Sequence, residues 1–249
     1  MTSGSPAANG QIDGGLRNDS PMGALFRQTR RVLFEELDLL DDLGPRGGAL
    51  NMALDEVLLA RVQRPLLRVY RWVRPAVSFG YFERWEPVAA AHPEREAVRR
   101  WTGGGVVLHG EDWTYSVIVP RDHPFARERA SEAYLALHSL LATAVAGGLE
   151  LTPEATEKRS RACFENPAQH DLLRDGQKVA GAAQRRTRFG MLHQGSVQGI
   201  TLPCGFAEKF AAVLAARFFP REVTSDELEA ARDLAAAKYG TPEWNRRIV

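Results

Sequence analysis

Three consecutive glycines, Gly103–Gly105, lie between two short apolar segments and constrain the chain to turn at that point. The residues around them, from Val98 to His109, have the pattern of two short strands joined by this turn. Because glycine has no Cβ, a ligand can approach the turn closely and meet its backbone N–H groups. An ordinary glycine-rich hairpin has the same pattern, and no Gly-Lys-Ser or Gly-Lys-Thr follows to form a phosphate-binding P-loop.

Elsewhere, apolar residues recur with helical and strand periods in turn. The predicted helices begin at Asn51 and Ser225, both good caps, and also cover residues 132–149 and 206–218. The predicted strands cover 66–72 and 76–82, as a hairpin or adjacent strands, then 114–120 and 195–203, while 31–40 fits a strand or a short helix. With no internal repeat, the sequence predicts a single α+β domain over residues 30–249, with a mixed, largely antiparallel sheet flanked by helices.

Composition narrows the functional classes. Residues 1–20 offer little to bury, so we expect a flexible N-terminal tail. Lys and Arg total 32 against 31 Asp and Glu, and this net charge of +1 gives no general attraction for nucleic acid. No apolar run approaches the roughly 18 residues of a membrane span, no secretion signal is apparent, and two cysteines make no disulfide framework. We expect a cytoplasmic protein that binds neither nucleic acid nor membrane.

The stretch from Cys163 to Gly195 holds side chains suited to acyl transfer. Cys163 is one of only two cysteines, Lys178 lies in a glycine-flanked turn, and His193 comes shortly before Gly195. If these side chains converge, a thiolate is the nucleophile, and a nearby cation stabilises both the thiolate and the negative charge that develops. In a purely structural interpretation, Lys178 is a surface turn residue and Cys163 a small buried apolar residue.

Other polar residues are less specific. His109 follows the glycine turn closely enough to reach a site there, although a single histidine is more often structural. The six histidines and two cysteines lack a metal-ligand spacing, so no metal site is predicted. Arg185, Arg186 and Arg188 form a basic patch that is either a solvated turn or a guide for an acidic carrier domain.

Four blocks of sequence together resemble one family. They are NMALDE from Asn51, RRWTGGG from Arg99 with the later His109, GQKVAGAAQ from Gly176, and HQG from His193. In this order the chain resembles the biotin/lipoate ligase catalytic domain superfamily, in its lipoate-protein ligase and octanoyltransferase branch. The Cys163–Phe164 pair before the lysine block is similar to that of the cysteine-dependent octanoyl-[acyl carrier protein]:protein octanoyltransferases, as is the closing KYGTPEWN.

The resemblance implies an acyltransferase of lipoate biosynthesis on a mixed sheet flanked by helices. Cys163 would attack the thioester of octanoyl acyl carrier protein, and Lys178 would stabilise the thiolate and the oxyanion. The octanoyl group would pass to the lysine of a lipoyl-carrier protein, either the glycine cleavage H protein or an E2 lipoyl domain, with no cofactor. The implied substrate-binding residues are Arg99, Thr102, Gly103, Gly104, Gly105, His109, Gly181, Gln184, His193 and Gly195.

Two other functions fit parts of the same sequence. In an ATP-dependent lipoate-protein ligase, with ATP and Mg²⁺ as cofactors, Lys178 would bind an acyl adenylate and Cys163 would be incidental. A non-catalytic relative would bind a lipoyl domain or an acyl group as a sensor. Two departures from the family pattern give this last interpretation some support: Gly110 stands where an Asp is common, and Ala182 where a Ser is frequent.

Overall fold

The computed structural model describes residues 1, 32–145, 147–155 and 163–248. Val32–Val249 forms one compact unit. The tail predicted over residues 1–20 lies, apart from Met1, outside the described residues. None of the helices within the described ranges has the length and apolar content needed to cross a bilayer.

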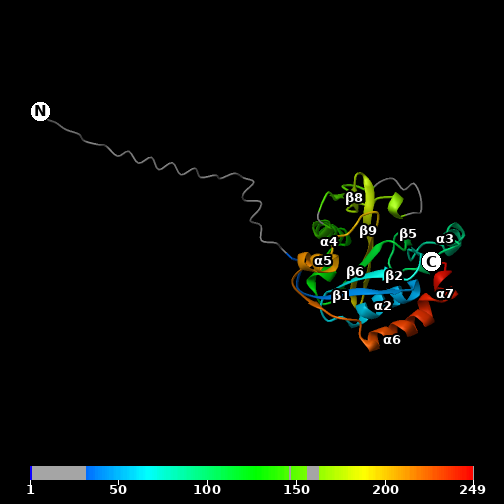
Figure 1. Ribbon diagram of the computed structural model, residues 1–249. Helices are drawn as coiled ribbons and strands as arrows, with labels where there is room; N and C mark the ends of the chain where they lie inside the picture. Colours follow the sequence, from blue (N-terminus) through cyan, green and yellow to red (C-terminus); the bar gives the residue numbers. More distant parts are fainter. Residues whose placement is uncertain (2–31, 146, 156–162, 249) are drawn as a thin grey trace. The chain divides into compact units, whose positions relative to one another are not determined.

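A large mixed sheet forms the framework of this unit (Figure 1). In spatial order its eight strands are β11 (Ala215–Pro220), β1 (Phe34–Arg46), β2 (Leu66–Trp72), β6 (Trp113–Pro120), β10 (Gly190–Val197), β9 (Gln177–Thr187), β8 (Leu172–Arg174) and β7 (Glu150–Leu151). β1 runs parallel to both neighbours, β11 and β2, and the other neighbouring strands are antiparallel. The predicted mixed, largely antiparallel sheet is confirmed.

A smaller sheet holds the glycine turn. Its order is β4 (Glu96–Arg99), β3 (Ala76–Phe79) and β5 (Val106–His109), with β3 parallel to β4 and antiparallel to β5. The strands predicted on either side of Gly103–Gly105 are therefore β4 and β5, separated by β3. The predicted pairing of 66–72 with 76–82 is wrong, because both edges of β2 are already paired, with β1 and with β6.

Helices cover both faces of the large sheet (Figure 1). α2 (Gly48–Arg61) and α6 (Ser225–Leu234) pack on one face, and α4 (Ala130–Val145) and α5 (Phe206–Leu214) on the other. Strand alternation fixes this arrangement: Val117 and Val119 of β6 join the core under α4 and α5, whereas Ile118 joins the core under α2. The shorter elements are α3 (Trp85–Ala91), α7 (Pro242–Asn245), the 3-10 turns η1 (Pro124–Arg127) and η2 (Cys163–Glu165), and the π-helical turn η3 (Ala235–Tyr239).

Asn51 does not cap α2, contrary to the prediction. The helix begins at Gly48, and Asn51 is buried inside it. Its side-chain amide donates to the carbonyl of Arg46 at 3.2 Å and to that of Arg71 at 3.3 Å. The asparagine therefore ties the helix to the ends of β1 and β2 instead of closing its first turn.

Two boundaries near the C-terminus also differ from the prediction. Thr224, not Ser225, caps α6: its hydroxyl accepts from the N–H of Glu227 at 3.2 Å, while the Glu227 carboxylate accepts from the N–H of Thr224 at 2.9 Å. The predicted helix over 206–218 ends at Leu214, and the next residues form β11. There, pairing with the free edge of β1 overrides local helix propensity.

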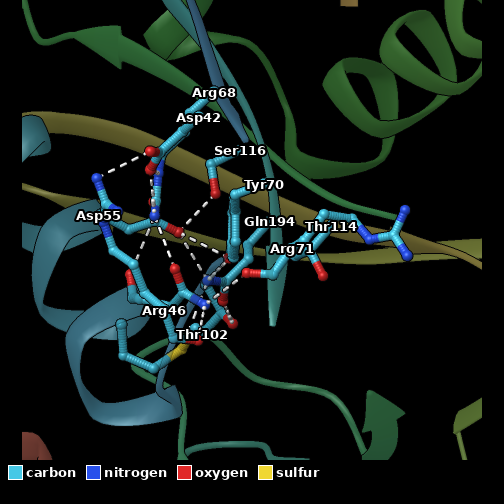
Figure 2. Close-up of polar contacts among 12 residues, drawn as sticks. Asp42, Arg46, Asp55, Arg68, Tyr70, Arg71, Thr102, Thr114, Ser116 and Gln194 are labelled. Carbon is cyan, nitrogen blue, oxygen red and sulfur yellow. Dashed lines mark hydrogen bonds and ion pairs between the residues drawn. The ribbon is translucent and has the colours of Figure 1, made fainter. Parts of the chain in front are cut away.

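A buried group of charges joins α2 to the large sheet (Figure 2). Arg68 of β2 donates to Asp42 at 2.9 and 3.0 Å and to Asp55 of α2 at 2.7 Å. Arg46 also pairs with Asp42, at 2.9 Å, so two guanidinium groups face two carboxylates and their charges balance. The sequence predicts Arg68 on the polar side of a half-buried strand; instead both faces of β2 are covered, and Arg68 is 0 % exposed.

Replacing Arg68 with leucine removes the main counter-charge of two buried carboxylates. We expect the free energy of unfolding to fall by about 3–5 kcal/mol, the usual cost of removing one partner of a buried ion pair. Arg64→Leu is the matched control, because the Arg64 side chain is 44 % exposed in its pairs with Glu36 and Asp38, and exposed pairs contribute about 0–1 kcal/mol. Urea denaturation followed by circular dichroism measures both losses, and equal losses would contradict the role assigned to Arg68.

Candidate functional site

A pocket lies where α2 and the large sheet meet the small sheet, and its atom-free space, including the solvent at its open mouth, is about 400 Å³. Its apolar wall comes from Met52, Tyr70, Trp72 and Val107. The remaining lining residues are small or polar: Gly104, Gly181, Ala182, Ala183, Gly195, Ser78, Arg100, His109, Thr114, Cys163, Gln194 and Ser196. Such a cavity suits a ligand with an apolar body and one reactive polar end.

Cys163 and Lys178 meet at this pocket. Cys163 lies in η2, and Lys178 lies at the start of β9. A tight turn at Asp175 (φ 52°) and Gly176 (φ 74°) joins β8 to β9 just before this lysine. The ammonium Nζ of Lys178 is 3.4 Å from Cys163 Sγ and donates to the Cys163 carbonyl at 2.9 Å. The two residues predicted to be catalytic are therefore in contact.

Asp171, which no sequence pattern singled out, holds Lys178 in place. Its carboxylate pairs with Lys178 Nζ at 2.7 Å, with 1 % and 2 % of the two side chains exposed. The same carboxylate accepts from the N–H of Ala168 at 2.6 Å and from the hydroxyl of Tyr134. A lysine on a strand of small apolar residues needs a buried counter-charge, and this requirement was the signal that could have found Asp171.

Gly181 makes room for this ion pair. A Cβ at position 181 would collide with the end of the Lys178 side chain and would lie 3.1 Å from Asp171 Oδ1. The hydroxyl of Tyr134 also accepts from the N–H of Ala182 at 2.7 Å. Burial, and then the neighbouring Asp171, hold the pKa of Tyr134 well above its usual range, so the phenol keeps its proton and donates to the carboxylate.

The glycine turn is held by its carbonyl groups. Arg100 donates to the carbonyls of Gly103 and Gly105 at 3.0 and 2.9 Å. Of the three glycines, only Gly104 (φ 85°) lines the pocket. A Cβ on Gly80, in the neighbouring loop, would collide with the Gly104 carbonyl, so the two loops are packed backbone to backbone. The carbonyl groups of this turn therefore hold it in place, and the expectation that a ligand meets its backbone N–H groups stays a prediction.

Arg99 and Arg100 point to different places, because neighbouring strand residues face opposite sides. Arg100 lines the pocket, where burial lowers its pKa and the nearby Cys163 partly opposes that effect. Arg99, predicted to bind substrate, is directed away from the pocket. It donates to the backbone carbonyls of Tyr81, Glu83, Trp244, Asn245 and Arg247.

His109 lies at the pocket wall, stacked on Trp72 with ring centroids 3.9 Å apart. Its Nδ1 is 2.7 Å from Asp112 Oδ2, and its Nε2 is 2.6 Å from Ser78 Oγ. Asp112 also accepts from the N–H of Gly110 at 3.0 Å. The carboxylate that the family pattern places directly after the histidine is therefore supplied two residues further on, and Gly110 does not leave His109 without a partner.

Gln194 lines the pocket, and Thr102 is bonded to it outside the lining. Gln194 accepts from Thr102 Oγ1 at 3.1 Å and donates to Asp55 at 2.8 Å (Figure 2). Asp55 also accepts from Ser116 at 2.6 Å. Thr102 thus supports the pocket from behind, and the buried charge group around Arg68 reaches the pocket wall through Gln194.

Gln184 and His193 lie behind the pocket rather than in its lining. Their side chains contact each other at 3.1 Å, and His193 Nε2 is 3.4 Å from the hydroxyl of Tyr115, which is 3.1 Å from His138 Nε2. Burial is the main reason that the pKa values of both histidines are lowered, that of His138 to about 4. These are neutral, structural histidines. Of the nearby predicted residues, Gly181 and Gly195 do line the pocket, and a Cβ on Gly195 would collide with Tyr115.

No group of three or more His, Cys, Asp or Glu side chains within the described ranges is arranged to bind a metal ion. At or beside the pocket lie one thiol, two cations and a hydroxyl–imidazole–carboxylate group, contributed by Cys163, Lys178, Arg100, Ser78, His109 and Asp112. Of this set, the thiol and the ammonium beside it can form or cleave a thioester.

The sequence is similar to known proteins of one family. Residues 48–229 match the model of the lipoyl protein ligase A/B catalytic domain. The chain is 36% identical over 165 residues to octanoyltransferase LipM of Oceanobacillus iheyensis, an alignment that covers 61% of this chain and 60% of that protein. It is 31% identical to octanoyltransferase LipM of Bacillus anthracis, over 79% of this chain and 93% of that protein. The chain thus spans less than two thirds of the first of these relatives.

Solved structures show the same fold. A putative lipoate protein ligase from T. acidophilum with bound lipoic acid has a TM-score of 0.69 and 21% identity, covering 85% of this chain and 98% of that one. A bipartite lipoate protein ligase from Thermoplasma acidophilum, described with its E2 lipoyl domain, has a TM-score of 0.64 and 20% identity, covering 88% and 98%. The chain belongs to the lipoyl protein ligase A/B catalytic-domain family.

Proposed function

We propose that this protein is a cysteine-dependent octanoyltransferase of protein lipoylation. It takes an octanoyl group from acyl carrier protein, holds it as a thioester on Cys163, and passes it to the lysine of a lipoyl-carrier protein. The observation that carries the proposal is the contact between Cys163 Sγ and the buried ammonium of Lys178, 3.4 Å apart at an apolar pocket. An ATP-dependent ligase does not need this contact.

In the first half-reaction, the thiolate of Cys163 attacks the carbonyl carbon of the donor thioester. A new C–S bond forms to Cys163, the bond to the carrier sulfur breaks, and the carrier leaves as a thiolate that takes a proton from water. Lys178 is aligned beside the sulfur by Asp171, so its charge stabilises the thiolate before attack and the oxyanion during it. The ammonium needs no movement for either task.

The lining of the pocket is suited to bind an apolar acyl chain. Met52, Tyr70, Trp72 and Val107 supply apolar surface, and each methylene removed from water contributes about 0.8 kcal/mol of binding. The glycines and alanines of the opposite wall leave the space open. An acyl chain inside this wall would present its carbonyl to Cys163.

The proposed acceptor is a lipoyl domain, either the glycine cleavage H protein or an E2 domain. Support comes from the octanoyltransferase relatives and from the Thermoplasma neighbour, which is described with an E2 lipoyl domain. Because the donor is already a thioester, the transfer requires no further activation of the acyl group. We therefore propose that the protein works with neither ATP nor Mg²⁺.

The thiol prediction uses both cysteines. After incubation with octanoyl acyl carrier protein, intact-mass analysis should find one octanoyl adduct on the wild type and on Cys204→Ala, and none on Cys163→Ala. Cys204 is exposed and is not among the pocket residues, so its variant controls for surface acylation. Full transfer activity in Cys163→Ala would refute the mechanism.

The cofactor prediction separates transferase from ligase. Octanoyl acyl carrier protein should modify an unmodified lipoyl domain at the same rate with and without ATP and Mg²⁺, and in the presence of EDTA. Free octanoate or lipoate should give no product under any of these conditions. Modification from the free acid that requires ATP would assign the protein to the ligases instead.

The lysine prediction tests the electrostatic role of Lys178. Lys178→Ala should slow acylation of Cys163 by about 10²–10³, a typical cost of removing one such group from a transition state. Iodoacetamide should also label the variant's thiol more slowly, because the thiolate has lost its neighbouring cation. Lys209→Ala is the control, since Lys209 lies on the exposed side of α5. Unchanged labelling in Lys178→Ala would show that the ammonium does not act on the sulfur.

A further inference from the structure

A second polar group faces the same pocket and has no part in the first half-reaction. Ser78 Oγ is 2.6 Å from His109 Nε2, and His109 Nδ1 is 2.7 Å from Asp112 Oδ2. All three residues are buried, and Ser78 and His109 line the pocket together with Cys163. The order hydroxyl, imidazole, carboxylate is the arrangement by which a histidine takes a proton from a hydroxyl group.

Asp112 lies against His109 as a fixed, charged carboxylate. Asp112 is fixed by donors in addition to His109: the N–H of Gly110, the hydroxyl of Thr114 at 2.9 Å and the hydroxyl of Ser196 at 2.8 Å. Burial raises the pKa of Asp112, but the adjacent His109 and the hydrogen bonds from Ser196 and Gly110 together lower it to about 2, so the carboxylate stays charged. A charged Asp112 stabilises an imidazolium, and Trp72 holds the ring plane by stacking.

Arg100 orients the hydroxyl. Its Nη1 donates to Ser78 Oγ at 2.8 Å, so the serine oxygen accepts from Arg100 and is left to direct its own proton at His109 Nε2. The rest of the Arg100 fork is anchored to the glycine turn. With one lone pair used by Arg100 and its proton directed at His109, the hydroxyl keeps a second lone pair.

The second half-reaction of the proposed function, on which this inference rests, needs a proton acceptor. When the ε-amine of the acceptor lysine attacks the octanoyl thioester, the nitrogen must lose a proton before a stable amide forms. Lys178 is poorly placed to take it, because Asp171 holds it as an ammonium in a buried ion pair. The imidazole of His109, in contact with the Ser78 hydroxyl at the same pocket, is the other group that can take it.

We propose that Ser78, His109 and Asp112 form a relay that takes the proton of the attacking lysine in the second half-reaction. The C–N bond forms, and the nitrogen gives its proton to Ser78 Oγ as the serine passes its own to His109 Nε2. The C–S bond breaks, and its electron pair stays on Cys163 as a thiolate beside the Lys178 ammonium. The imidazolium, paired with Asp112, afterwards returns its proton to solvent through Ser78.

The test separates the two half-reactions. The wild type and Ser78→Ala are first converted to the octanoyl-Cys163 form and freed of carrier, and the adduct is measured by intact mass. The decay of the adduct is then followed with an unmodified lipoyl domain and, separately, with hydroxylamine, which cleaves thioesters at neutral pH without a base. We expect Ser78→Ala to lose about 10²-fold in transfer to the lipoyl domain and to be unchanged both in acylation and towards hydroxylamine.

A second variant and a control complete the design. His109→Gln should show the same selective loss, and it carries the test if circular dichroism shows that Ser78→Ala does not fold. Ser139→Ala, in which a hydroxyl bonded to the Leu135 carbonyl within α4 is removed, should behave as the wild type throughout. Transfer to lysine at the wild-type rate, or an equal loss with lysine and hydroxylamine, would overturn the relay. A wild type that forms no adduct would instead refute the proposed function, and the relay with it.

Discussion

The carboxylate of Asp55 is the point at which fold and pocket are joined. It neutralises Arg68 inside the sheet and accepts from Ser116 and Gln194, so one buried charge connects α2, β2, β6 and β10. Gln194 in turn lines the pocket. Because an uncompensated charge at this depth is costly, these bonds favour the observed position of α2 on the sheet. The position of α2 therefore helps to determine the shape of the pocket.

Two polar groups then meet at the same pocket. The sheet edge formed by β8 and β9 supplies a fixed cation and, with η2, a thiol, while the small sheet supplies a hydroxyl backed by a histidine. The two groups suit different chemical tasks. A positive charge beside sulfur stabilises a leaving thiolate, whereas an amine nucleophile needs a neutral group to receive its proton, and one side chain does not serve both needs in a single state.

The sequence predicts several residues of the candidate site, but not which side chains face the pocket. Cys163 and Lys178 could be predicted because a cysteine that precedes a lysine among small apolar residues is a specific part of this family pattern. The motif contains both Arg99 and Arg100, and the sequence predicts substrate binding by Arg99. Only the strand register decides which of the two side chains faces the pocket, and it is that of Arg100. The sequence does not indicate Asp171, Ser78 or Asp112, because only the tertiary structure brings their partners to them. It also does not indicate where α5 ends, because the residues after the helix pair with β1 as a strand.

The parallel pairing of β1 with β11 also constrains how the chain reaches this structure. Phe34 is opposite Ala215, so the partner of a thirteen-residue strand comes from far along the sequence. Contacts of such large sequence separation form slowly. Until β11 arrives, one long edge of β1 has unpaired backbone groups, which can template pairing with another chain. Aggregation during refolding should therefore compete with closure of this one edge, and a chaperone that shields it would raise the yield of native protein without changing its final stability.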